Sequence, residues 1–90
     1  MPQIEFSLQL SEHVDCPVQG EFPVGTIRTG LAQWFQQYPK LSEYLLDSDG
    51  NLRGHLSIFI DGVMVRSSDA LDQEVGGSSE VFVMQAISGG

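Results

Sequence analysis

Residues 55–66, HLSIFIDGVMVR, carry the clearest structural signal in this chain of 90 residues. Apolar side chains at alternate positions fall on one side of an extended backbone, as in a strand that buries one face, whereas Phe59 falls on the other side. The expected buried set is Leu56, Ile58 and Ile60. Asp61-Gly62 comes next, and this dipeptide favours the two-residue turn of a β-hairpin. The segment therefore predicts two antiparallel strands joined by a tight turn.

Three further segments predict strands. Residues 3–10 alternate between apolar and polar side chains, which indicates a half-buried strand. Residues 17–22 predict a short second strand, with Pro17 and Pro23 favouring the edge of a sheet. Residues 80–87 predict the last strand, which follows a turn over 76–79. The expected inward sets are Ile4, Phe6 and Leu8 in the first strand and Val81 and Val83 in the last.

One main helix is expected between the second strand and the hairpin. Thr26 suits the N-cap position, and Pro39 is expected to end the helix. Its apolar stripe has helical spacing and consists of Ile27, Leu31, Trp34, Phe35 and Tyr38. A short helical turn and a polar loop are expected after Pro39, and a further single turn over 69–72.

The order strand, strand, helix, strand, strand, strand fits an α+β fold. It predicts a mixed five-stranded sheet with the helix packed on one face. Residues 1–87 are expected to form a single domain, and residues 88–90 a flexible C-terminal tail.

The composition limits the partners and the location of the protein. Four Lys and Arg against twelve Asp and Glu give a net charge of −8, which disfavours nucleic acid and favours a basic protein surface. No apolar run is long enough to span a bilayer, and no signal peptide is recognisable. With Cys16 as the lone cysteine, a cytoplasmic location is expected.

No intrinsic active site or metal site is expected. The DSDGN motif at 47–51 resembles the start of a calcium loop, but the glycine and glutamate required further on are absent, so a polar hairpin-like loop is expected. Cys16, His13 and His55 match neither a zinc site nor a nucleophilic pair and are interpreted as structural or solvent-facing. The protein is therefore expected not to be an enzyme.

The ending Ser88-Gly89-Gly90 is the remaining candidate for chemistry. Glycines without a β-carbon could thread a narrow channel and present the carboxylate of Gly90. That carboxylate is ionised and unreactive until an ATP-using enzyme adenylates it, after which it could accept sulfide, a thiol or an amine. A frayed terminus without function is the alternative.

Two stretches resemble the ubiquitin-like β-grasp sulfur carriers: the ending EVFVMQAISGG and the central LLDSDGNLRGHLSIFIDGVMVR. This family includes the small subunit of molybdopterin synthase, the thiamine thiazole carrier and the carrier of an alternative cysteine pathway. The resemblance covers the whole chain, and the central stretch is most similar to the cysteine-pathway carriers. Molybdopterin-synthase subunits often have prolines where this chain has Gln85 and Ala86, which disfavours that assignment.

The resemblance implies a protein co-substrate that binds no cofactor. An E1-like enzyme would use ATP to adenylate Gly90, which would then carry sulfur as a thiocarboxylate (1-thioglycine) for the biosynthesis of cysteine, a thio-metabolite or a sulfur-containing cofactor. Other implied partners are a sulfur donor of rhodanese or cysteine-desulfurase type, a downstream biosynthetic enzyme and a processing metalloprotease. Gly89 and Ser88 would thread the tail into the activating enzyme.

A docking surface follows from the alternation in the strands. With their neighbours turned inward, Phe59, Phe82 and Met84 are expected on the uncovered sheet face, where they would bind a partner. Three alternatives stay open: a ubiquitin-like modifier conjugated to lysines, a molybdopterin synthase small subunit, and an interaction module with an irrelevant tail. Self-conjugation into chains is not expected, because Lys40 is the only lysine.

Overall fold

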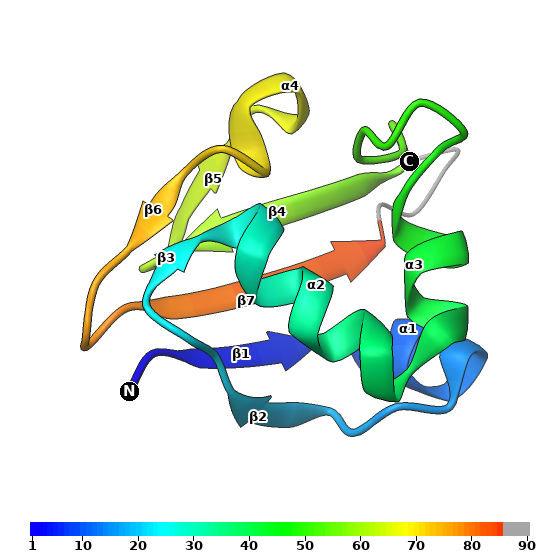
Figure 1. Cartoon of the computed structure of the whole chain (residues 1–90), viewed down its shortest axis with the longest axis horizontal. Coiled ribbons are helices and arrows are strands. Elements are labelled where there is room, and N and C mark those ends of the chain that lie inside the picture. Colours follow the sequence, from blue (N-terminus) through cyan, green and yellow to red (C-terminus); the bar gives the residue numbers. More distant parts are fainter. Residues whose placement is uncertain (86–90) are drawn as a thin grey trace.

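A computed structural model of the protein describes residues 1–85, except for the side chains of residues 67 and 68. Its main sheet has five strands in the order β2-β1-β7-β4-β5 (Figure 1). The strands are β1 (Gln3–Phe6), β2 (Gln19–Glu21), β4 (Leu56–Ile60), β5 (Val63–Val65) and β7 (Glu80–Gln85). β1 and β7 run parallel at the centre, and the other pairs are antiparallel. The expectation of a mixed five-stranded sheet is confirmed.

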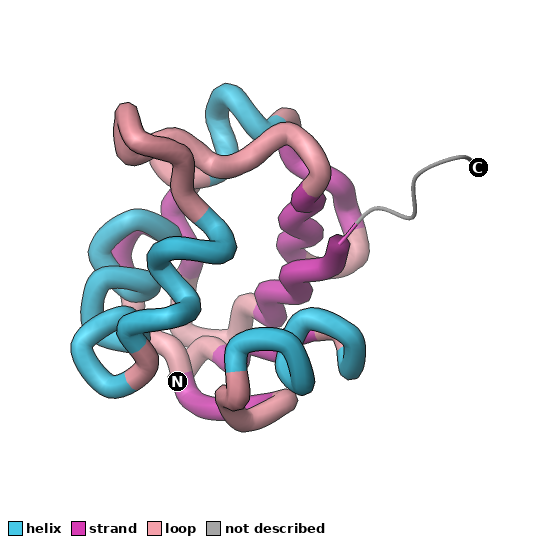
Figure 2. The backbone as a smooth tube through the Cα atoms, turned by 90° about the vertical axis from the view of Figure 1, so that its right-hand side faces the viewer, coloured by secondary structure: helices cyan, strands magenta, loops and turns pink. Residues whose placement is uncertain are grey.

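The described helices are α1 (Leu8–Val14), α2 (Ile27–Gln37), α3 (Pro39–Leu45) and α4 (Ser67–Ala70). α2 and α3 lie on one side of the main sheet, so the architecture has two layers (Figures 1 and 2). A small second sheet, which the sequence did not predict, pairs β3 (Gly25–Thr26) with β6 (Glu74–Val75). The final strand is described as far as Gln85, and the expected tail over 88–90 lies outside the described residues.

The first strand is shorter than predicted, and the prediction that Leu8 faces inward is wrong. β1 ends at Phe6, and Ser7 caps α1 by accepting a hydrogen bond from the backbone N–H of Leu10. Within α1, Leu10 and Val14 are buried on one helical face, whereas Leu8 is 66% exposed. The apolar spacing within residues 4–10 is compatible with a strand in the first part of this segment and with a helix in the last part. Ser7, the N-cap of α1, marks the boundary between the two.

The predicted main helix is confirmed as α2. The Thr26 hydroxyl accepts a hydrogen bond from the backbone N–H of Thr29 at 3.2 Å, which caps the helix as expected. Ile27 and Leu31 are fully buried, and Trp34 packs edge-on against Phe6 of the sheet at a ring-centroid distance of 5.3 Å. After α2 ends, the chain continues directly into α3, which spans seven residues and is longer than the expected single turn.

The Asp61-Gly62 hairpin is also confirmed. Both residues have positive φ, 52° for Asp61 and 83° for Gly62, as the two central residues of a type I′ turn require. The Asp61 carboxylate accepts a hydrogen bond from the backbone N–H of Glu80 at 2.9 Å. The turn is therefore attached to the beginning of β7 as well as joining β4 to β5.

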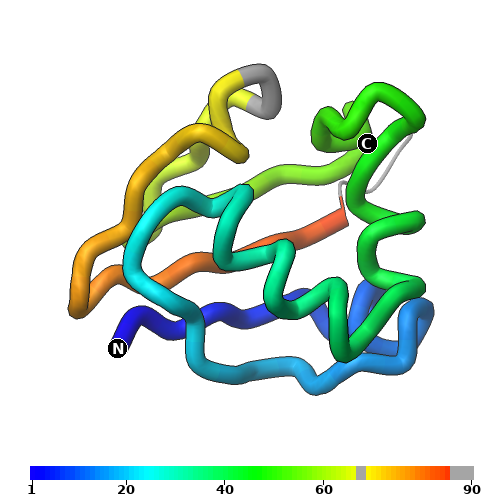
Figure 3. Tube along the Cα trace, in the orientation of Figure 1, coloured from blue at the N-terminus to red at the C-terminus, as the bar shows by residue number. Residues whose placement is uncertain are grey.

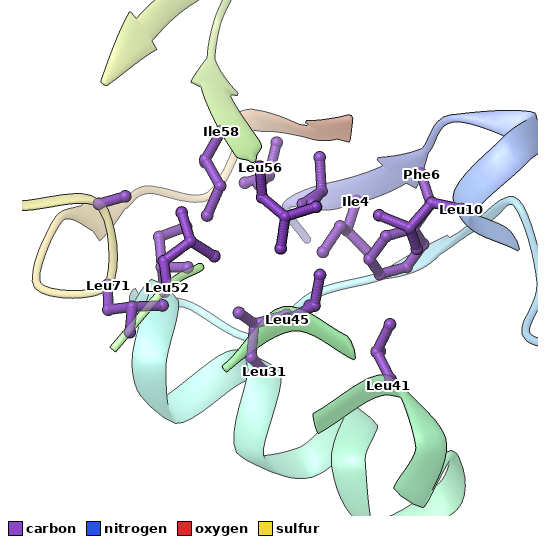
Figure 4. Close-up of a cluster of buried hydrophobic side chains, with 14 of the residues drawn as sticks. Ile4, Phe6, Leu10, Leu31, Leu41, Leu45, Leu52, Leu56, Ile58 and Leu71 are labelled. Carbon is purple, nitrogen blue, oxygen red and sulfur yellow. The ribbon is translucent and has the colours of Figure 1, made fainter. Parts of the chain in front are cut away.

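The core fills the space between the sheet and the helices (Figure 4). From the sheet it receives Ile4, Phe6, Leu56, Ile58, Val81 and Val83, and from the helices Leu10, Ile27, Leu31, Leu41 and Leu45. Ile60, predicted to be inward, is only partly buried and packs at the edge of this cluster. Among residues 1–85, no helix has the length and apolar character needed to cross a membrane.

Candidate functional site

The sheet face opposite α2 and α3 carries a continuous row of side chains from all five strands. Strand register places Met64 opposite Phe59, Phe59 opposite Phe82, and Phe82 beside Glu5, which in turn lies opposite Gln19. The rings of Phe59 and Phe82 are in contact distance, with centroids 6.3 Å apart. The uncovered face therefore presents apolar groups over β5, β4 and β7 and polar groups over β1 and β2.

Two adjoining hollows, of about 490 and 500 Å³, make this face concave. Glu5, Phe82 and Met84 line both hollows, so we treat them as one groove, the sheet-face groove. Phe59 lines its first part, and Gln85 lines its second part. The groove therefore runs to the last described residue of β7. The three residues predicted to form a docking surface, Phe59, Phe82 and Met84, are half-buried in it together.

The groove has acidic character. Glu5 and Glu80 line it, and no Lys or Arg occurs among its described lining residues. Asp61 is exposed at the adjacent hairpin turn. An apolar floor between carboxylates is complementary to a partner surface that has an apolar centre and basic residues around it.

Sequence reasoning missed two exposed apolar residues on or near the groove. Met64 is 61% exposed and lies opposite Phe59. The sequence alone could have placed Met64, because the two-residue turn fixes the register of the hairpin. In that register, Phe59 and Met64 form the second residue pair from the turn. Leu8 is 66% exposed and lines the second part of the groove. It was missed because residues 3–10 were interpreted as one strand.

Cys16, which was also considered as a candidate reactive residue, lies in a buried structural environment. Cys16 is buried and free, and the Ser11 hydroxyl donates a hydrogen bond to its carbonyl oxygen. Burial raises the pKa of the Cys16 thiol, an interaction of the thiol itself with the Ser11 side chain lowers it in part, and the Asp15 carboxylate raises it further. A protonated, buried thiol is a poor nucleophile and a poor metal ligand.

The DSDGN loop is hairpin-like, as predicted. The Asp47 carboxylate accepts hydrogen bonds from the backbone N–H groups of Asp49 and Asn51 at 2.9 and 3.0 Å, and Leu46 and Leu52 form an antiparallel bridge. Asp47 therefore stabilises the loop itself. Within residues 1–85, no three His, Cys, Asp or Glu side chains are grouped so that they could hold a metal ion.

The chain is similar in sequence to a protein named as a sulfur carrier and in fold to several solved structures. Over 65 residues it is 38% identical to the "Putative sulfur carrier protein" of Archaeoglobus fulgidus, a match that covers 72% of this chain and 74% of that protein. No family model matches the chain. The chain therefore belongs to the ubiquitin-like β-grasp sulfur carrier family, as the sequence analysis predicted.

Solved structures agree on the β-grasp fold. The Amycolatopsis orientalis BexX/CysO complex matches with a TM-score of 0.83 and 17% identity over all of both chains. Mycobacterium tuberculosis CysO matches with a TM-score of 0.81 and 20% identity over 97% of this chain and all of that one. The small archaeal modifier protein 1 of Haloferax volcanii matches with a TM-score of 0.73 and 16% identity, over 96% and 97% of the two chains.

Proposed function

We propose that the protein carries sulfur as a thiocarboxylate on Gly90 and takes part in biosynthesis as a co-substrate. The observation that supports this most strongly is the 38% identity to a protein named as a sulfur carrier, in a chain with the Gly89-Gly90 ending. The same reasoning holds whether Gly90 is encoded as the last residue or is exposed by a processing metalloprotease.

The chemistry has two steps, both performed by partner enzymes. First, an oxygen of the Gly90 carboxylate attacks the α-phosphate of ATP, giving an acyl-adenylate and releasing pyrophosphate. Next, hydrosulfide attacks the activated carbonyl carbon, a C–S bond forms, and the C–O bond to AMP breaks. A donor of rhodanese or cysteine-desulfurase type would supply the sulfur as a protein persulfide, from which a thiol reductant releases hydrosulfide while the two thiols left behind are oxidised to a disulfide. A downstream biosynthetic enzyme would receive the sulfur from Gly90. Because glycine has no β-carbon, Gly89 would let the tail enter a narrow active-site channel.

The sheet-face groove is proposed as the docking site for the E1-like activating enzyme. It combines a concave apolar floor with carboxylates, and it leads to the end of β7, which precedes the tail. A partner bound there would lie beside the segment that carries Gly90. Among the similar solved structures, the BexX/CysO complex is one in which a protein with this fold is bound to a partner protein.

Substitution of groove residues tests this docking role. Phe59→Ser and Met84→Ser together should weaken binding of the activating enzyme by about 30-fold or more, since truncating a central apolar anchor costs about 2 kcal/mol. Val24→Ser is the matched control, because Val24 is 64% exposed in the loop between β2 and β3. Affinity is measured by isothermal titration calorimetry, and circular dichroism verifies folding. Wild-type affinity in a folded double variant would refute the docking role.

Conjugation to proteins is the second candidate function. The fold is shared with small archaeal modifier protein 1, and an acyl-adenylate reacts with an amine as well as with sulfide. In that case a lysine of a target protein would replace hydrosulfide as the nucleophile. Lys40 is the only lysine of the chain, so chains of linked copies could grow only through this residue or the N-terminal amine.

A further inference from the structure

The last two residues of β7 have a strand neighbour on one side only. On the β1 side, pairing ends where Phe6 meets Val83, because β1 stops and the chain turns into α1. On the β4 side, pairing continues to Met84 and Gln85. A strand end paired on one side opens more readily than the centre of the sheet. The position of the last two described residues of β7 therefore depends on additional contacts.

One such contact comes from α3. Gln85 points to the same side as the buried Val81 and Val83, and its side-chain oxygen accepts a hydrogen bond from the Tyr44 hydroxyl. The two residues are 41 positions apart in sequence. Figure 3 shows the end of β7 next to α3. This hydrogen bond joins the final strand to the helical layer at the position where the described chain ends.

Tyr44 is itself held on two sides. Its ring packs against the imidazole of His13 from α1 at a centroid distance of 4.6 Å, and it meets the ring of His55 edge-on at 5.7 Å. The end of α3 is attached to the following loop, since the backbone N–H of Arg53 donates to the carbonyl of Leu45 at 2.9 Å. The hydroxyl of Tyr44 thus projects from a fixed position toward β7.

We propose that Tyr44 is a positioning residue for the tail: by holding Gln85 it fixes the end of β7, and with it the reach of Gly90. This inference rests on the proposed function. Five residues follow Gln85 up to Gly90, which fully extended would reach about 16–18 Å. If the end of β7 opened, this reach would lengthen, but the activating enzyme would have to order the released residues. A fixed end removes that cost before binding.

Tyr44→Phe tests the proposal because it keeps the ring between His13 and His55 and removes only the hydroxyl. Loss of one neutral hydrogen bond, about 1 kcal/mol, should raise amide hydrogen exchange at Met84, whose N–H faces β4, by up to about five-fold, with Val81 unchanged. Tyr38→Phe is the matched control, because it also removes one tyrosine hydroxyl, but from a ring that packs on Trp34 with the ring centroids 5.6 Å apart. Equal exchange rates in the two variants at Met84 would overturn the proposal.

Steady-state kinetics distinguish a role of Tyr44 in positioning the tail from a general effect of Tyr44 on the stability of the fold. In ATP–pyrophosphate exchange with a purified E1-like enzyme of the same organism, Tyr44→Phe should raise KM for the carrier by up to about five-fold and leave kcat unchanged. Gln85→Leu should have the same effect, and the double variant should be no worse than either single variant. An unchanged KM, or effects that add in the double variant, would overturn the proposal.

The two proposals fail in different ways. If the wild-type chain supports no ATP–pyrophosphate exchange, the proposed function is wrong, and the amide-exchange comparison alone decides whether Tyr44 holds the end of β7. If the wild type is active and Tyr44→Phe behaves like Tyr38→Phe, the positioning role is wrong and the carrier function stands.

Discussion

Gly30→Ala should destabilise the fold, although the same change stabilises most helices. Gly30 lies in α2, where replacing glycine by alanine ordinarily gains about 1 kcal/mol. Here a Cβ would lie 2.2 Å from Cζ of Phe22, so the ring would have to move by about 1.3–1.8 Å to restore ordinary contact. Phe22 is fully buried, so its ring can move only against neighbouring protein atoms. Overpacking of this kind costs about 1–3 kcal/mol.

Three atoms of the Phe22 ring would lie within 2.9 Å of the new Cβ, so the cost falls in the upper part of this range, at about 2–3 kcal/mol. After subtraction of the helix-propensity gain of about 1 kcal/mol, the free energy of unfolding should fall by about 1–2 kcal/mol, and Tm by about 4–16 °C for a domain of this size. Urea and thermal denaturation followed by circular dichroism measure both quantities. Combining Gly30→Ala with Phe22→Leu should show a favourable coupling energy, because the smaller side chain leaves room for the methyl group. A Gly30→Ala variant at least as stable as the wild type would contradict the close packing of α2 on Phe22.

Three further predictions concern the turn, the buried thiol and the tail. Gly62→Ala should lower the free energy of unfolding, measured by urea denaturation, by about 1–2 kcal/mol, because the φ of Gly62 is 83°, in the left-handed region. Gly54→Ala is the control and should change this free energy little, because a Cβ added at Gly54 would meet no atom within 4 Å. The free energy of unfolding should fall as the pH rises above about 8.5, because the Cys16 thiol ionises in the unfolded chain while its raised pKa keeps it protonated in the folded chain. In Cys16→Ala, denaturation measured as a function of pH should lack this decrease. A chain ending at Ser88 should fold normally by circular dichroism but support no ATP–pyrophosphate exchange, and residual exchange would argue against activation at Gly90.

The parts of the fold predicted correctly have strong local signals. Asp61-Gly62 specifies its turn through the backbone angles that this dipeptide adopts readily, and Thr26 with the apolar stripe specifies α2. Alternation within β4 and β7 also placed Phe59, Phe82 and Met84 on the uncovered face.

The parts that were missed depend on tertiary contacts or on very short segments. The first residues of α1, 8–10, were interpreted as strand because their apolar positions continue the alternation of β1, and only Ser7 marks the change. β3 and β6 have two residues each, too few for a periodic pattern. The contact between Tyr44 and Gln85 joins positions 41 apart, and no local pattern indicates it. Their proximity follows from the packing of α3 on the end of β7.

The measurement that tests the carrier function most directly is the intact mass of the protein after incubation with its E1-like enzyme, ATP and a sulfur source. We expect a mass gain equal to the difference between one sulfur and one oxygen atom, located at Gly90 by fragmentation and absent without ATP. An unchanged mass together with covalent adducts on lysines of other proteins would contradict it and favour the modifier function.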